Sequence, residues 1–390
     1  MEGSLTSIIN LIFGPQHPAL HEPELFRFKV EGEIVVKAEP RIGYVHRGIE
    51  KLFEKNAYIK GIYLSERICG ICNVAHTVCY CQAVENVMNI EPPPRAKYLR
   101  AVVHELNRIH SHLLLLGVAA EELGFDTLFM LIWRDRELVM DLIELITGNR
   151  VMSAFNTIGG VRRDVNAETI EKVLKVLPKL EERVKYYRKV FEEDPTIRKR
   201  TVDVGILPRR DAIRYCVVGP MARGSAVDVD IRRDIPYAAY DEIPFNVIVR
   251  DECDVWARLM VRVDEVLESI DIVRYALEHL PSGQIRLPLK RSAPPGEAIS
   301  RVEAPRGELL YHLVSKGGIT PYRLKVRTPT LANLLAASKL FEGHTIADIP
   351  AILVSIDPCF ACTDRVTLVD VKSGKSTKVS LRELARRGRE

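Results

Sequence analysis

Two Cys-X-X-Cys units, one toward each end of the chain, constrain the fold more than any other feature. Cys69 and Cys72 form the first unit, and Cys359 and Cys362 form the second, in a chain of 390 residues. A Cys-X-X-Cys turn places two sulfur atoms on the same side of one metal, and four thiolates suit zinc, an iron–sulfur cluster or nickel. A metal held by both units requires a fold that brings distant parts of the chain together at its centre.

The spacing alone leaves two kinds of metal site open. A structural zinc site is the usual explanation for two such pairs, but its pairs normally lie close in sequence and form a small knuckle. A metal buried at the centre of a domain is better suited to a catalytic role than to a purely structural one. Four further cysteines have no ligand spacing: we expect Cys79 and Cys81 to be buried packing thiols, and we assign no role to Cys216 or Cys253.

The charge balance argues against nucleic-acid binding. The chain has 56 basic and 52 acidic residues and a formal net charge of +4, whereas neutralising phosphates needs a clear basic excess. Residues 366–390 hold seven basic and three acidic residues, so the excess lies in a cationic tail. No apolar run approaches the roughly 20 residues of a membrane span, and no secretory signal is expected. The sequence therefore predicts a soluble chain or a peripheral subunit held by others.

Helical periodicity dominates the middle of the chain. Apolar residues at helical spacing predict helices over residues 76–88, 95–122, 126–147, 167–193, 254–280 and 330–342. Alternating residues predict a β-hairpin over residues 24–38 and strands over residues 302–328, around a Gly317-Gly318 turn. Residues 194–250, rich in Gly, Pro, Asp and Arg, are expected to be irregular and to wrap the helices.

These elements predict one mainly α domain. We expect residues 1–365 to form it, with an N-terminal β region over residues 1–50. Residues 51–365 would supply a central helical bundle, wrapping loops and minor C-terminal strands. Residues 366–390 are expected to form a separate tail.

The residues that flank the cysteines resemble a known family. Residues 67–76 read Arg-Ile-Cys-Gly-Ile-Cys-Asn-Val-Ala-His, and residues 357–365 read Asp-Pro-Cys-Phe-Ala-Cys-Thr-Asp-Arg. Both segments resemble the cysteine motifs of the large subunit of nickel–iron hydrogenases. Four further segments are similar to the membrane-bound, energy-converting branch of that family, which shares ancestry with the quinone-site large subunit of respiratory complex I: residues 14–18, 42–50, 219–224 and 303–307. The resemblance covers residues 10–365 and implies a hydrogenase large-subunit-like fold.

The resemblance implies a nickel–iron centre. In the family all four cysteines bind nickel, and the second of each pair also bridges to an iron that carries CO and cyanide. Cys69 and Cys359 would then be terminal nickel ligands, and Cys72 and Cys362 would be the bridges. Complex I subunits have lost these cysteines, whereas this chain keeps them. Electrons would arrive from a [4Fe–4S] cluster in an adjacent small subunit.

Further site residues follow from the same resemblance. Glu22 matches the family's proton-relay glutamate, with Cys359 as the first base. Arg306 matches the arginine over the open metal position, and Asp357 is expected to orient it by a charge-assisted bond. The alternatives are a surface acid at residue 22 and an exposed turn at residue 306.

Three more residues complete the predicted site. His76 is expected to hydrogen-bond a bridging sulfur, and Arg67 belongs to the same motif and is expected to lie at the cofactor. Glu50 matches a glutamate that binds a structural Mg²⁺ in relatives, although Arg365 stands where the family has a histidine ligand.

The function implied is proton reduction to H₂ in a membrane-bound complex, on the cytoplasmic face of the membrane. Ferredoxin would be the electron donor, and partners would be the Fe–S small subunit and other hydrophilic and antiporter-like membrane subunits that couple the reaction to ion translocation. The alternatives are a sulfur-, polysulfide- or quinone-reducing subunit without a mature nickel–iron site, and a structural scaffold that holds zinc. In the family a protease cuts after the residue matched by Arg365, so residues 366–390 are a candidate maturation propeptide.

Overall fold

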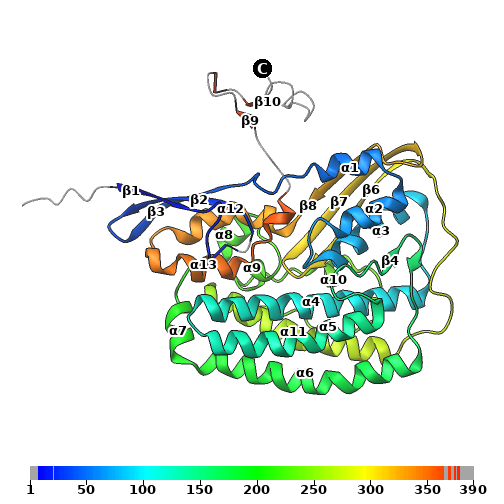
Figure 1. Cartoon of the computed structure of the whole chain (residues 1–390), viewed down its shortest axis with the longest axis horizontal. Helices are drawn as coiled ribbons and strands as arrows, with labels where there is room; N and C mark the ends of the chain where they lie inside the picture. The colour runs from blue at the N-terminus through cyan, green and yellow to red at the C-terminus, as the bar shows by residue number, and fades with distance from the viewer. Residues whose placement is uncertain (1–7, 21, 364–367, 370–372, 375, 378–390) are drawn as a thin grey trace, which may run out of the picture.

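A computed structural model describes residues 8–20, 22–363, 368–369, 373–374 and 376–377 of the protein. Four long helices lie roughly parallel in one half of the molecule, and two three-stranded sheets with shorter helices form the other half (Figure 1). The four long helices are α4 (Pro94–Glu122), α5 (Asp126–Thr147), α6 (Ala167–Glu193) and α11 (Val255–Glu278). Their predicted extents are confirmed to within two residues at each end.

Helix α4 is the centre of the bundle. It begins at Pro94, whose fixed φ suits the first helical turn, and it is buried around nearly its whole circumference between residues 96 and 120. A helix buried on all sides usually carries apolar residues only, but α4 also buries arginine, glutamate and histidine side chains. These charges must find partners inside the protein, and they do so on α11 and on the segments that cover the bundle.

Strands β6 (Ala293–Ala304), β7 (Gly307–Gly318) and β8 (Arg323–Arg327) form an antiparallel sheet in the order β6-β7-β8. The prediction of minor strands was wrong in extent, because β6 and β7 are twelve residues each. The predicted turn at Gly317-Gly318 is confirmed, because these residues end β7 where the chain turns into β8, and a further turn at Pro305 and Arg306 joins β6 to β7. Pro294, Pro295 and Gly296 weaken the strand signal of β6, and prolines are tolerated there because β6 is an edge strand.

Three helices pack beside this sheet, and they carry the first cysteine pair. They are α1 (Ile49–Lys55), α2 (Tyr58–Glu66) and α3 (Asn73–Met88). Helix α3 packs on β6 and β7, and Cys79 and Cys81 on this helix are fully buried, as expected. The sequence reasoning missed α1 and α2, and it began α3 three residues late.

The N-terminal sheet contains β1 (Ile8–Phe13), β2 (Leu25–Glu31) and β3 (Ile34–Arg41), and the predicted hairpin of residues 24–38 is confirmed as β2 and β3. Helix α12 (Pro329–Phe341) packs on β3, and α13 (Ile349–Ile356) follows. Phe26 of β2 lies 5.8 Å from Phe341 and 6.2 Å from Phe360 between ring centroids. Because Phe360 lies inside the second Cys-X-X-Cys unit, this aromatic contact ties the second cysteine loop to the sheet.

Residues 194–250 are mostly irregular, as predicted, with four short helices: α7 (Pro195–Thr201), α8 (Arg209–Arg214), α9 (Pro220–Arg223) and α10 (Ile231–Asp234). The remaining short elements are β4 (Asn156–Thr157), β5 (Gly160–Val161), η1 (Ile346–Asp348), η2 (Phe360–Cys362), β9 (Leu368–Val369) and β10 (Ser376–Thr377). Arg365 and most of the predicted tail of residues 366–390 lie outside the described residues. Within the described part of the chain, every helix is too short or too polar to cross a membrane.

Two glycines allow the β6–β7 turn to touch the loop before α9. Gly219 has φ +67° and Gly307 has φ +122°, conformations that residues with a Cβ rarely adopt. A Cβ on Gly219 would lie 2.4 Å from the Cα of Gly307, and a Cβ on Gly307 would lie 2.6 Å from the nitrogen of Gly219. Since the opposing atoms are backbone, neither substitution can be accommodated by a side-chain rotation.

We therefore predict that Gly307→Ala lowers the free energy of unfolding by about 2–4 kcal/mol. The matched control is Gly343→Ala, because Gly343 also has a positive φ of +86° but has open space where its Cβ would be. The control should cost only the local backbone strain, about 1–2 kcal/mol. Denaturant unfolding of the purified chain measures both values, and equal losses would contradict the proposed close contact.

Candidate metal centre

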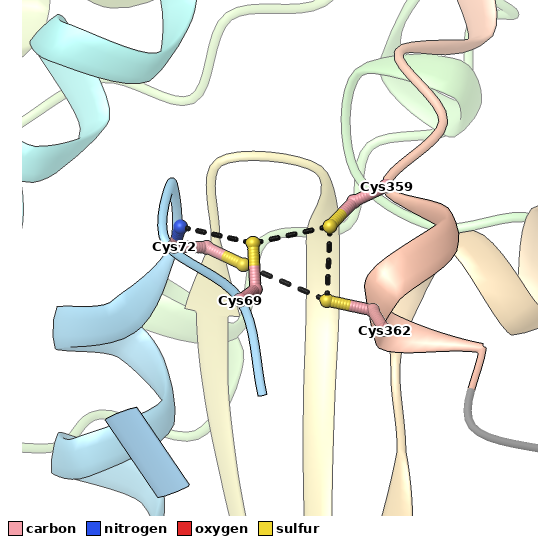
Figure 2. A group of neighbouring side chains, drawn as sticks. All are labelled: Cys69, Cys72, Cys359 and Cys362. Carbon is pink, nitrogen blue, oxygen red and sulfur yellow. Dashed lines mark hydrogen bonds between the residues drawn. The ribbon is translucent and has the colours of Figure 1, made fainter. Parts of the chain in front are cut away.

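The four cysteines of the two units meet at one buried point. Their sulfur atoms all lie within 4.8 Å of one another, and each residue is at most 5 % exposed. The Sγ–Sγ distance is 3.1 Å between Cys69 and Cys359, 3.8 Å between Cys72 and Cys362, and 3.2 Å between Cys359 and Cys362. Figure 2 shows the two pairs facing each other across this point. Chain segments from opposite ends of the sequence thus form one sulfur cluster.

The local backbone explains how each pair is presented. Cys69 lies in the turn between α2 and α3, and Cys72 is the residue that caps the N-terminus of α3. The sulfur of Cys69 accepts hydrogen bonds from the N–H groups of Ile71, at 3.3 Å, and Cys72, at 3.4 Å. These two donors fix the position of the Cys69 sulfur within the turn.

The second pair follows a sharp reversal at the end of α13. Asp357 caps α13 with a left-handed backbone (φ +55°), and Cys359 to Cys362 then make a single turn of 3₁₀ helix. The N–H of Cys359 donates to Thr330 Oγ1 at 3.0 Å, and the hydroxyl of Thr328 donates to the carbonyl of Cys362 at 3.0 Å. The start of α12 therefore holds both ends of the second turn.

The sulfur cluster fits a thiolate-bound metal. All four cysteines are free, and four sulfurs each about 2.3 Å from one ion would stand about 3.3 to 3.8 Å apart in square-planar or tetrahedral arrangements. The three sulfur distances given above lie in or near that range. Because none of the four sulfurs is tied up in a disulfide, the whole donor set is available to a soft metal.

The ionisation of the sulfurs also calls for a nearby positive charge. The pKa of Cys72 is lowered well below its usual value, first by hydrogen bonds from the Cys359 and Cys362 thiols. The pKa of Cys362 is raised well above its usual value, first by its hydrogen bond with Cys359 and further by burial. Several thiolates cannot share a buried pocket without a compensating cation, which a metal ion would supply.

One arginine that sequence reasoning did not single out joins the two cysteine loops. Arg47 donates to the carbonyls of Arg67 at 3.0 Å, Ile68 at 2.9 Å and Ala361 at 2.7 Å. Ile68 directly precedes Cys69, and Ala361 lies between Cys359 and Cys362. A single planar guanidinium therefore bridges segments about three hundred residues apart; we call this set of bonds the Arg47 clamp.

His76 lies beside the cluster, as expected. Its Nε2 is 3.5 Å from the sulfur of Cys362, and its Nδ1 is 2.8 Å from the hydroxyl of Tyr311. Both side chains are buried, and Tyr311 comes from β7. The tyrosine hydroxyl thus orients the imidazole toward the sulfur. Nothing in the sequence signalled Tyr311, which is 235 residues from His76.

Arg306 and Asp357 form an ion pair at the cluster. Arg306 Nη2 lies 2.6 Å from Asp357 Oδ1, and its Nε donates to the Asp357 carbonyl at 2.9 Å. Its third contact is Ser111 Oγ on α4, at 3.1 Å. Arg306 is only 4 % exposed, which excludes the alternative of an exposed turn arginine. Burial acts to lower the pKa of Arg306, but Asp357 and the nearby cysteine sulfurs raise it, so the guanidinium stays charged.

Glu22 reaches the second cysteine loop. Its Oε2 accepts a hydrogen bond of 2.8 Å from the N–H of Ala361. Glu22 and Leu20 line an open hollow of about 460 Å³ and also an inner, mostly apolar cavity of about 60 Å³. Arg306 and Asp357 line the same inner cavity. Glu22 therefore lines both the open hollow and the inner cavity that Arg306 and Asp357 reach.

Two predicted site residues lie elsewhere. The side chain of Arg67 is about half exposed and pairs with Glu66 at 2.8 Å, so it does not reach the sulfurs. Glu50 accepts from Arg323 at 3.2 Å, Lys325 at 3.3 Å and the N–H of Val326 at 3.0 Å. These donors surround the carboxylate with positive charge, so its surroundings do not suit a Mg²⁺ ion.

Comparison with known families matches two models along the chain. The model described as "Respiratory-chain NADH dehydrogenase, 49 Kd subunit" matches residues 122–293 and 289–365. The model described as "Nickel-dependent hydrogenase" matches residues 47–116, which contain the first cysteine pair. The hydrogenase model therefore covers the first cysteine pair, and the 49 Kd subunit model covers the second.

Individual relatives show the same two kinds of protein. The membrane-bound hydrogenase subunit alpha of Pyrococcus furiosus is 39 % identical over 96 % of this chain and 91 % of its own length. A D-type subunit of the NADH-quinone oxidoreductase of Rhizobium etli is 36 % identical over 92 % of this chain and 96 % of its own length. A solved structure of the membrane-bound sulfane sulfur reductase, an archaeal respiratory membrane complex, matches with a TM-score of 0.88 and 33 % identity, over 93 % of this chain and all of that chain.

The Arg47 clamp yields a prediction about metal affinity. Arg47→Lys keeps the charge but cannot reach several carbonyls at once, so the two cysteine loops should be held together less firmly. We expect the affinity of the full chain for Zn²⁺, used as a thiolate-seeking probe, to fall by about 10- to 100-fold. Arg67→Lys is the control, because its side chain points away from the cluster. Competition with a chelator measures both, and an unchanged affinity in Arg47→Lys would refute the clamp.

Proposed function

Because the chain belongs to the family that includes the large subunits of membrane-bound nickel-dependent hydrogenases and the D-type subunits of NADH-quinone oxidoreductases, we propose that it is the catalytic large subunit of a membrane-bound [NiFe] hydrogenase. The observation that carries the proposal is the buried cluster of four free cysteine sulfurs. Nickel accepts four thiolates, and a structural zinc site would not call for a charged arginine and a cavity beside it. The reaction proposed is 2 H⁺ + 2 e⁻ → H₂.

In this proposal Cys69, Cys72, Cys359 and Cys362 would together hold a nickel–iron centre. A nickel–iron centre held there would supply the redox change that joins two protons and two electrons. His76 lies with its Nε2 3.5 Å from the sulfur of Cys362, where a hydrogen bond to the sulfur would stabilise negative charge on that ligand.

The remaining residues position charge and move protons. Arg306 places a fixed positive charge beside the sulfurs, and Asp357 and Ser111 hold its guanidinium in one orientation. Glu22 takes up protons at the open hollow and delivers them toward Cys359, the first proton acceptor at the cluster. The apolar inner cavity leaves room for a small apolar product and little room for water.

Electrons come from another subunit in this proposal. Among the described residues the four-cysteine cluster is the one group of side chains arranged to hold a metal, so this part of the chain offers no second redox centre. The relatives are subunits of membrane complexes. We propose a partner subunit that carries an Fe–S cluster, ferredoxin as the donor, membrane subunits that translocate ions, and a peripheral position on the cytoplasmic face of the membrane.

The similarity to the sulfane sulfur reductase favours a second candidate. In this candidate the fold and the partner subunits are the same, and the acceptor is a sulfur chain that is reduced without a mature nickel–iron pair. The two candidates differ in what the cluster holds, so metal content separates them.

We predict that the purified complex contains about one nickel per chain, with infrared bands of CO and cyanide ligands. Cys362→Ser should abolish both signals, because it removes one of the four sulfurs. Cys81→Ser is the matched control, since Cys81 is equally buried but belongs to α3 packing. A folded, active complex without nickel would reject the hydrogenase proposal and leave the sulfur-reducing one.

A second prediction concerns the proton route. Glu22→Gln keeps an oxygen that can accept from the N–H of Ala361 but removes the exchangeable proton. We expect proton-dependent turnover to fall by about 10²- to 10⁴-fold while nickel content stays unchanged. Glu168→Gln, at an exposed position on α6, serves as the control. Unaltered turnover in Glu22→Gln would remove Glu22 from the route.

A further inference from the structure

Two buried arginines on α11 face the end of α13, where the second cysteine loop begins. Arg258 and Arg262 lie four residues apart, so their side chains project from the same face of the helix. Each is at most 1 % exposed. A buried guanidinium needs acceptors around it, so the groups that these two side chains contact show what they hold in place.

Arg258 is satisfied by neutral oxygens. Its Nε donates to Ser355 Oγ at 3.0 Å, and its Nη2 donates to the carbonyl of Gly205 at 2.9 Å. A further acceptor is the carbonyl of Cys253, at 3.4 Å. Ser355 lies in the last turn of α13, two residues before Asp357. Arg258 therefore ties the end of α13 to the helical bundle through neutral groups.

Arg262 differs, because its partner on α13 is charged. Its Nη1 donates to the carbonyl of Arg258 at 2.7 Å, and its Nε lies 3.8 Å from Asp357 Oδ2, close enough for an ion pair but too far for a hydrogen bond. In the part of the chain that the structure describes, neither Arg262 Nε nor Asp357 Oδ2 has a hydrogen-bond partner. Burial lowers the pKa of Arg262 to about 10, so the guanidinium is charged at neutral pH. The ion pair therefore compensates two buried atoms that face each other.

Asp357 joins Arg262 to Arg306. Its Oδ1 lies 2.6 Å from Nη2 of Arg306, whereas its Oδ2 faces Arg262, so each carboxylate oxygen serves one guanidinium. The two guanidinium groups come from different elements, α11 and the β6–β7 turn. A carboxylate that must satisfy one cation at each oxygen is held in one orientation.

The backbone of the turn that carries Arg306 is held by other contacts. Arg108 on α4 donates to the carbonyl of Glu303 at 2.6 Å, and the carboxylate of Glu303 accepts from Arg223 at 2.8 Å. The close backbone contact of Gly307, described above, holds the other side of the turn. These contacts do not set the direction of the long Arg306 side chain. That direction depends on the groups that bind its guanidinium, above all the carboxylate that pairs with it.

We propose that Arg262 is a positioning residue for Arg306 and acts through Asp357. Helix α11 carries the fixed charge, Asp357 is held between two guanidinium groups, and Arg306 is thereby kept beside the cysteine sulfurs. Removing the charge of Arg262 leaves Asp357 Oδ2 buried without a counter-charge, so the carboxylate shifts and Arg306 shifts with it. The inference about turnover rests on the proposed hydrogenase function, whereas the inference about the linked ion pairs does not.

A double-mutant cycle on the unfolding of the full chain tests the link independently of activity. Arg262→Met removes one charge and Asp357→Asn removes its partner, so each should raise the unfolding equilibrium constant. The product of the two single effects should exceed the effect of the double variant by about 10- to 100-fold. If Arg262→Met alone does not fold, recovery of folding in the double variant supports the link, and continued failure contradicts it.

The matched control is the cycle of Arg258→Met with Asp357→Asn. Arg258 is equally buried on the same face of α11 but bonds to neutral oxygens, so the two effects should multiply independently. Independent effects in the cycle of Arg262→Met with Asp357→Asn would overturn the proposal.

Turnover of the complex tests the effect on Arg306. At unchanged nickel content, Arg262→Met should lower kcat by about 10- to 100-fold, because Arg306 is displaced from its place at the reacting metal. Arg262→Lys keeps a positive charge facing Asp357 and should recover most of this loss, which a purely structural role would not require. Equal losses in the two variants, or loss of nickel from Arg262→Met, would refute the positioning role. If the double-mutant cycle shows the coupling and the complex holds no nickel, the proposed function fails and the link between Arg262 and Asp357 stands.

Discussion

The approach of Cys69 to Cys359, 3.1 Å between sulfur atoms, is the contact on which the rest of the structure depends. It joins two short turns, and these turns are not linked to each other through a sheet or a shared helix. The surrounding elements hold these turns: α12 through two threonines, the N-terminal sheet through Phe360, and the Arg47 clamp across the gap. The surrounding fold thus holds the four sulfurs together.

Buried charge is the second theme of the structure. Moving an ion from water into a protein interior costs several kcal/mol, and this chain does so repeatedly on α4 and α11. Two groups of these buried charges lie near the turn of Arg306: Arg306 itself with Asp357, and the arginines that surround Glu303. Such networks add little to stability compared with apolar packing, so their value lies in fixing where a charge stands. Arg306 receives its position from both groups.

The elements and site residues that could be predicted from the sequence are those that a short stretch of neighbouring residues identifies. The long helices carry a clear apolar period, and the two cysteine motifs and Arg306 stand in recognisable segments. Sequence reasoning misjudged β6 because prolines hide an edge strand, and it placed Arg67 at the cofactor, whereas this side chain is about half exposed and pairs with Glu66. It could not find Tyr311, Arg47 or the partners of Glu303. These contacts join residues that lie far apart in the sequence and meet only in the folded chain.

The Arg47 clamp is exposed to solvent although the sulfurs it secures are buried. Its three bonds to the two cysteine loops go to backbone carbonyls, and charge-assisted hydrogen bonds of this kind contribute about 1.5–3 kcal/mol each. The link between the two cysteine loops is therefore reachable from outside the protein, whereas the sulfurs that it brings together are not.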